Sequence, residues 1–235
     1  MGMPRDRKRN EFAPVGAFVN SLPSLKQSGS ALLVIGDVPN DVHAYASRRM
    51  LGQNSDEDRH QLIVLTDGDY TGASQRLISD QVATDETTSI ISHCPPARSA
   101  ASPPIPLLER IPIRQLSNED LYGFSTAIHE EIADFESKTD GLEPAELRVC
   151  MSSIAPLLAV HDVQSVFRFV HLVTGRVKHS KGIVHAHLPI QRDCYDVKLL
   201  EPLFDATIEL RLQGSEVQQR WRMTDREGMS RWMVM

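Results

Sequence analysis

The first residues with the potential for chemistry follow the apolar run ALLVI, at a turn that begins with Gly36. A strand that enters a helix through such a turn is a common phosphate site, because backbone N–H groups and the helix N-terminus point at one spot. The phosphate-loop pattern G-x-x-x-x-G-K-[ST] adds a lysine and a hydroxyl group. Here Asp41 occupies the second glycine position, Val42 the lysine position and His43 the hydroxyl position. The pattern predicts the shape of a phosphate-binding turn without its chemistry.

Two acidic residues, Asp67 and Asp69, follow a second short apolar segment. Acidic side chains just past a parallel strand lie on the ligand-facing edge of an open sheet, where they can bind magnesium. An ordinary Asp-Gly turn explains the same residues. We favour the turn and retain both aspartates as candidate residues of the ligand edge.

His185 and His187 project from one face of a predicted strand, because side chains alternate with a period of two. This spacing suits a metal ion, but catalytic zinc usually has three protein ligands. His93 with Cys94, or Asp205, would complete the set only if the fold brought them close. Local hydrogen bonding of the two histidines is the alternative. We favour this alternative and predict no metal and no cofactor.

An acid/base pair of His43 and Asp41 is a further hypothesis for the turn. The sequence offers no nucleophile motif beside it, and it has no Gly-x-Ser-x-Gly segment. We therefore predict no catalytic residues.

Composition favours one soluble α/β domain. The chain has 235 residues, of which 41% are hydrophobic, a net charge of −6 and three cysteines. No apolar run approaches the roughly 20 residues of a membrane span, and the polar N-terminus lacks a signal peptide, which predicts a cytoplasmic protein without membrane contact. The acidic charge disfavours nucleic acid. We expect a tail with a short helix over 1–24 and one domain over 25–235, with a Pro-rich loop at 94–106.

Apolar periodicity predicts strands that alternate with helices, which indicates a mostly parallel sheet covered on both faces and closed by an antiparallel hairpin. The clearest predicted helix begins with a cap at Ser117. The strands are expected at 31–35, 61–66, 87–92, 147–152, 183–188, 206–212, and 217–223 with 231–235. The helices are expected at about 41–51, 72–80, from 117 to near 139–141, 163–177 and 197–204, with a short helix that follows a cap at Ser153.

The last strand carries basic and aromatic residues in alternation, with Arg220 and Arg222 on one side and Trp221 on the other. Such a ribbon can bind nucleic acid through phosphate contacts and stacking. Charge on an edge strand also prevents pairing with other chains, and we favour this explanation.

Two segments resemble the RecA-like ATPases of the KaiC kind, and more closely a haloarchaeal family of degenerate KaiC-like proteins. They are LRVCMSSIAPLL, and VFRFVHLVTGRVKHSKGIVHAHL followed by LEPLFDATIEL. The resemblance extends from about Leu25 to the C-terminus. It places Ser152 where active relatives have the aspartate that helps to hold magnesium. The bias of 19 Arg over 6 Lys fits a salt-adapted source.

The resemblance implies a RecA-like fold, an archaeal source and an inactive ATPase that regulates or signals through a protein partner or through self-association. The first alternative is a sensor that binds a nucleotide or another small molecule without hydrolysing it. A weaker alternative is a nucleic-acid-binding relative of the recombinases.

Overall fold

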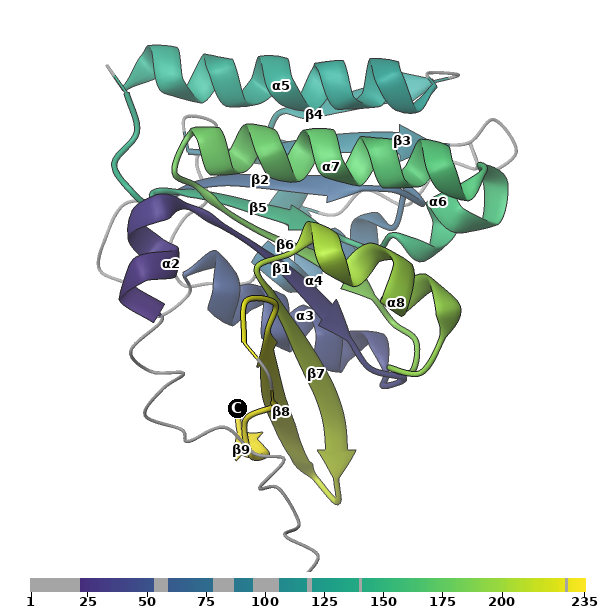
Figure 1. The fold of residues 1–235 in the computed structure, drawn as a ribbon. Coiled ribbons are helices and arrows are strands. Elements are labelled where there is room, and N and C mark those ends of the chain that lie inside the picture. Colours follow the sequence, from purple (N-terminus) through teal and green to yellow (C-terminus); the bar gives the residue numbers. More distant parts are fainter. Residues whose placement is uncertain are drawn as a thin grey trace, which may run out of the picture.

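The chain folds around one nine-stranded sheet with the order β4-β3-β2-β5-β6-β1-β7-β8-β9 (Figure 1). A computed structural model describes residues 22–52, 59–77, 87–94, 106–117, 120–139, 141–226 and 228–235. The strands from β4 to β7 are parallel, and β8 and β9 are antiparallel to their neighbours. This confirms the predicted α/β class with a mostly parallel sheet and a C-terminal antiparallel hairpin.

The strands are β1 (Ser30–Ile35), β2 (His60–Leu65), β3 (Thr88–Cys94), β4 (Ile113–Ser117), β5 (Leu147–Met151), β6 (Ile183–Leu188), β7 (Ala206–Gln213), β8 (Glu216–Met223) and β9 (Met233–Val234). The α-helices are α2 (Leu22–Ser28), α3 (Asn40–Leu51), α4 (Tyr70–Leu77), α5 (Leu121–Lys138), α6 (Ala155–Val160), α7 (Val163–His179) and α8 (Tyr195–Leu200). Two 3-10 helices, η2 (Pro106–Arg110) and η3 (Glu201–Leu203), complete the described elements.

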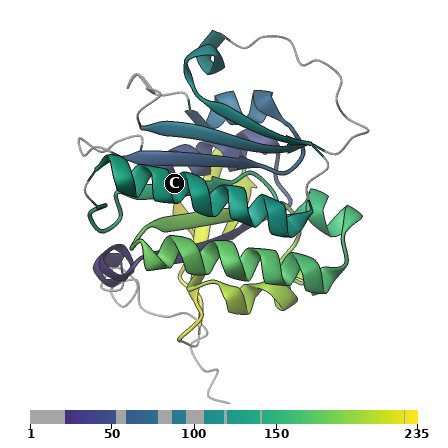
Figure 2. The ribbon, with the colours of Figure 1, turned by 90° about the horizontal axis from the view of Figure 1, so that it is seen from above.

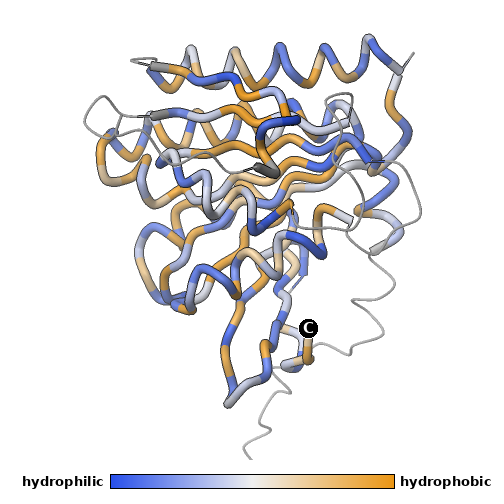
Figure 3. The backbone as a smooth tube through the Cα atoms, turned by 180° about the vertical axis from the view of Figure 1, so that it is seen from behind, coloured by the Kyte–Doolittle hydropathy of each residue, from blue (hydrophilic) through white to orange (hydrophobic). Residues whose placement is uncertain are grey.

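Helices cover both faces of the central strands (Figures 1 and 2). On one face α5 and α7 pack against the sheet through side chains such as Phe124 and Phe169. On the other face α3 and α4 contribute Val42, Leu51 and Ala73. Burial on both faces explains why β1, β5 and β6 are almost continuously apolar. Figure 3 shows this apolar character along the central strands.

The structure corrects two expectations about element boundaries. Ser117 does not cap a helix, because it belongs to the edge strand β4 and pairs with Cys94. The helix α5 begins at Leu121, and its cap is Asp120, whose carboxylate accepts a 2.8 Å hydrogen bond from the Gly123 N–H. The strand β4 does not stand out in the sequence because it lies at the edge of the sheet and lacks the continuous apolar residues of the five-residue central strand β5.

The C-terminal strands also differ in detail from the prediction. The main partner of β8 is β7, which runs beside it over eight residue pairs, whereas the two-residue strand β9 covers only Gln218 and Gln219. Helix α2 spans the predicted boundary between 24 and 25. Its Pro23 lies in the first turn, where a helix tolerates proline. The tail at 1–11 and the interior of the Pro-rich loop, 95–105, lie outside the described residues.

Candidate functional site

The carboxyl end of β1 is a topological switch point of the sheet. The connection from β1 runs through α3 on one face to β2, whereas the connection from the neighbouring β6 runs through α8 on the other face to β7. In open α/β sheets, ligands bind in the crevice that such opposite connections create. The predicted phosphate turn therefore lies where a ligand site is expected.

Gly36 brings this turn against β7. Its φ angle is 135°, and a Cβ atom at this position would lie 2.5 Å from the carbonyl oxygen of Leu210. Its N–H donates a 3.1 Å hydrogen bond to the carbonyl of Ile190, in the loop after β6. Glycine is thus required by close backbone packing, and its amide is engaged within the chain.

A carboxylate of the protein, that of Asp41, lies at the N-terminus of α3. The carboxylate of Asp41 accepts a 2.9 Å hydrogen bond from the N–H of Val42, and that N–H also lies 3.0 Å from the Pro39 carbonyl oxygen. Val42, at the lysine position, is only 5% exposed and packs in the core between α3 and the sheet. A negative charge and a buried apolar side chain therefore occupy the positions that serve phosphate in the loop pattern.

His43 points inward and begins a chain of buried hydrogen bonds. Its Nε2 lies 3.0 Å from the Gly36 carbonyl oxygen, and its Nδ1 lies 2.8 Å from Nδ1 of His187. The Nε2 of His187 lies 2.7 Å from the hydroxyl of Ser47. All three residues are buried.

The direction of this chain follows from its acceptor end. A carbonyl oxygen only accepts, so Nε2 of neutral His43 carries the proton and its Nδ1 accepts. His187 then donates from Nδ1, and its Nε2 accepts from Ser47. Because the Ser47 proton is used in this way, the Cys150 thiol, 3.6 Å from the Ser47 oxygen, is the donor in that contact. Each link thus has a defined donor and acceptor.

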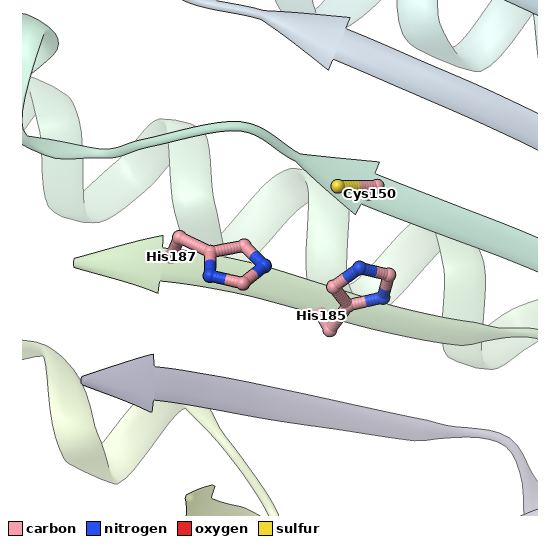
Figure 4. Close-up of side chains that lie close together, drawn as sticks. All are labelled: Cys150, His185 and His187. Atoms are coloured by element: carbon pink, nitrogen blue, oxygen red, sulfur yellow. The ribbon is translucent and has the colours of Figure 1, made fainter. Parts of the chain in front are cut away.

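Cys150, His185 and His187 form a cluster on β5 and β6 (Figure 4). One potential ligand atom from each residue lies within 4.8 Å of the other two. Cys150 is paired in register with His185, and both are completely buried. Neither ring nitrogen of His185 has a hydrogen-bond partner among the residues that the structure describes.

Burial keeps this cluster uncharged. Burial, together with the nearby guanidinium groups of Arg76 and Arg148, lowers the pKa of His185 to about 3. Burial is also the largest cause that lowers the pKa of His187 and of His43. It raises the pKa of the Cys150 thiol. The histidines are therefore neutral and Cys150 is a thiol at neutral pH.

Three other predicted site residues have structural roles. Ser152 joins the ends of β5 and β2, since its N–H donates to the Val64 carbonyl at 2.9 Å. The Asp67 carboxylate accepts from the N–H of Asp69 at 3.1 Å, and the Asp69 carboxylate accepts from the N–H of Gly72 at 2.9 Å. These two contacts are those of a turn and a helix start.

The sequence does not identify Cys150 as the third member of the histidine cluster, and the candidates that it offers, His93 and Asp205, lie elsewhere. His93 stacks on Phe124, on the α5 side of the sheet, with ring centroids 4.9 Å apart. Asp205 accepts a 2.8 Å hydrogen bond from the Ala31 N–H and pairs with Lys178 at 2.7 Å. Cys150 takes the expected place instead. The only signal in the sequence is its position in a neighbouring apolar strand, and the register that aligns it with His185 is not readable there.

A polar cleft of about 500 Å³ opens beside the turn. Its lining includes Asp37, Arg192, Glu209 and Arg220. Arg220 pairs with Glu209 at 2.8 Å, and Arg192 pairs with Glu201 at 2.8 Å. The positive charges of these two arginines are thus balanced by carboxylates of the chain.

Fold and site together define an α/β protein with a ligand-type crevice at its switch point and a buried thiol–histidine cluster beneath it. The chain belongs to DUF7504, a family of unknown function, whose profile matches residues 29–210. The match ends within β7, so β8 and β9 lie beyond it. No curated protein matches the sequence. Among the described residues, no helix combines the length and apolar character needed to cross a membrane.

Proposed function

We propose that the chain is a RecA-like module of the KaiC kind that does not hydrolyse ATP and that acts as a regulatory protein-interaction domain. The observation that carries this proposal is the Asp41 carboxylate at the N-terminus of α3, bonded to the Val42 N–H where a phosphate would bind. A helix N-terminus favours negative charge, and here the protein supplies that charge itself.

The electrostatics of the turn support the loss of nucleotide turnover. In phosphate loops a lysine cradles the β- and γ-phosphates, and a hydroxyl and an acidic residue hold Mg²⁺. In this chain the lysine position is a core residue, Val42, and the hydroxyl position is His43, which is bonded to Gly36. Ser152, at the acidic position, bonds within the sheet. A triphosphate would meet the repulsion of Asp41 with no lysine to offset it.

Exposed apolar side chains support a role in protein contacts. Tyr122 is 75% exposed and Leu172 is 42% exposed, and both line a groove of about 320 Å³ between α5 and α7. Phe169 and His161 also line this groove. Exposed apolar surface that surrounds a groove is typical of sites where proteins bind.

The first experiment is isothermal titration of the protein with ATP and Mg²⁺ at low and high salt. We expect no binding heat and no thermal stabilisation. Binding at micromolar levels would overturn the proposal, because other groups would then have to replace the missing lysine.

The second experiment tests the groove through sedimentation and co-purification. The Tyr122→Ser and Leu172→Ser variants should lose self-association or a co-purifying protein that the wild type retains. Tyr195→Ser is the matched control, since Tyr195 is 71% exposed but lies on α8. A wild-type protein that stays monomeric and retains no partner would contradict the interaction role.

A small-molecule sensor is the second candidate, favoured by the 500 Å³ cleft beside Gly36. Asp41 and Asp37 make a neutral or cationic ligand a better fit than a triphosphate. A thermal-shift series with nucleosides, amines and Mg²⁺-ATP separates the two candidates. Nucleoside or amine stabilisation that Asp37→Asn removes would favour the sensor.

Binding of nucleic acid has less support. Arg222 pairs with Glu201 at 2.6 Å, and Arg220 pairs with Glu209. A salt-dependent mobility shift that disappears in Arg220→Ala and Arg222→Ala variants would reverse this order of preference.

A further inference from the structure

His185 presents a physical problem that the proposed function does not explain. Its ring is completely buried, and neither nitrogen has a hydrogen-bond partner among the described residues. Buried polar groups without partners are rare in native structures, and an ion or a water molecule commonly accounts for them. An apolar residue would fill the same position without this cost. The unpartnered His185 ring therefore indicates that a small ligand, such as a single ion, binds to it within the core.

We propose that Cys150, His185 and His187 bind one copper(I) ion between β5 and β6 (Figure 4). Two imidazoles and a thiolate are a donor set that copper and zinc use in proteins. Ligands around a three-coordinate ion lie about 3.5–4.0 Å apart, as follows from metal bonds of about 2.0–2.3 Å at trigonal angles. One potential ligand atom of each residue already lies within 4.8 Å of those of the other two, and side-chain rotations would close the site.

The hydrogen bonds around His187 suit this assignment. A histidine that binds a metal usually donates its other ring N–H to a protein group, which fixes the ring. His187 donates from Nδ1 to His43, and His43 donates to the carbonyl of Gly36. Nε2 of His187 is then available for the ion once the Ser47 hydroxyl turns away from it. That hydroxyl lies 3.6 Å from the Cys150 sulfur, to which it can donate when the sulfur is a thiolate.

Charge favours copper(I) over zinc. The positive charge of Arg76 acts on Cys150, His185 and His187. Binding releases the Cys150 proton to solvent, so copper(I) and the thiolate together are neutral, whereas zinc and the thiolate retain one positive charge. A buried net charge beside Arg76 is costly. Complete burial of Cys150 and His185 also suits three-coordinate copper(I) better than zinc that needs water as a fourth ligand.

The test uses the full chain in a Cys94→Ser and Cys194→Ser background, which leaves Cys150 as the one thiol. The metal-free protein is titrated anaerobically with copper(I) against a chromophoric chelator, and in parallel with zinc. We expect one equivalent of copper(I), and weaker zinc binding. Cys150→Ala and His185→Leu should each lower copper affinity by about 100-fold or more, and His43→Phe, which removes only the support of His187, by about 10- to 100-fold.

His171→Leu is the matched control, because His171 is exposed on α7, and it should bind copper(I) as the background does. X-ray absorption of the copper-loaded protein should show one sulfur and two nitrogen ligands, a result that needs no variant to fold. Copper binding that survives Cys150→Ala and His185→Leu, or a spectrum without nitrogen ligands, would overturn the proposal. Tighter binding of zinc than of copper(I) would overturn the choice of metal. The copper proposal does not depend on whether the protein binds ATP. Failure of the copper titration would therefore leave the proposed function standing, and failure of the ATP test would leave the copper site standing.

Discussion

Acid should destabilise the metal-free protein through its buried histidines, and His185 allows the magnitude to be worked out. Its pKa is about 3 in the folded state and 6.5 in an ordinary environment. Between these values the unfolded chain binds a proton that the folded chain does not, so the free energy of unfolding falls as the pH falls. The loss is about 1.4 kcal/mol per pH unit. From pH 7 to pH 5, His185 alone therefore removes about 2 kcal/mol.

The assay compares urea unfolding of wild type, His185→Leu and His171→Leu at pH 7 and pH 5 in the presence of a metal chelator. At pH 7, His185→Leu should be more stable than wild type by about 1–3 kcal/mol, because two unpaired buried nitrogens disappear. Its loss of stability on acidification should be smaller than that of wild type by about 2 kcal/mol. His43 and His187, whose pKa values are also lowered, retain the remaining acid sensitivity.

Two results would refute this reasoning. Equal acid sensitivity in wild type and His185→Leu would mean that the His185 ring is protonated or solvated in the folded protein. An acid response altered as much by His171→Leu, on the exposed side of α7, would mean that the effect does not come from burial.

Three further substitutions test the site and the packing around it. Gly36→Ala should lower the free energy of unfolding by about 1–3 kcal/mol, because the turn needs positive φ and close approach to β7, which chemical denaturation measures. Ser47→Ala should cost about 1–3 kcal/mol in the metal-free protein and shift the ring resonances of His187, because the Nε2 acceptor loses its donor. Arg176→Ala should cost about 1 kcal/mol, since it removes a 2.7 Å ion pair to Glu136 that joins α7 to α5, and calorimetry at low and high salt should show the difference shrink with salt.

The sequence predicts the centre of the sheet well for a physical reason. Strands buried on both faces need continuous apolar residues, and β1, β5 and β6 show that pattern. The edge of the sheet carries less of this signal. In β4, Ile113 and Leu116 lie on opposite faces, and only Leu116 is buried whereas Ile113 is 39% exposed. The following residues Ser117 to Asp120 offer several possible helix caps, and the choice among them depends on strand pairing.

The candidate site shows the same division between local and long-range information. The period of two correctly places His185 and His187 on one face of β6. Cys150 joins them only through the register of β5 on β6, which two segments more than thirty residues apart establish when they fold together. The loop pattern places His43 in a turn at the ligand edge, whereas its side chain enters the core and reaches His187. Sequence spacing does not encode that direction.

Two residues that depart from the phosphate-loop pattern, Val42 and His43, have buried side chains. Val42 replaces a lysine and packs in the core, so a lysine at this position would be buried without a partner in the present fold. His43 replaces a hydroxyl residue and links the Gly36 carbonyl to His187. His43 thus fixes the turn to β6, whereas Val42 packs in the core between α3 and the sheet. The His43–His187 hydrogen bond therefore joins the turn directly to the buried cluster of Cys150, His185 and His187.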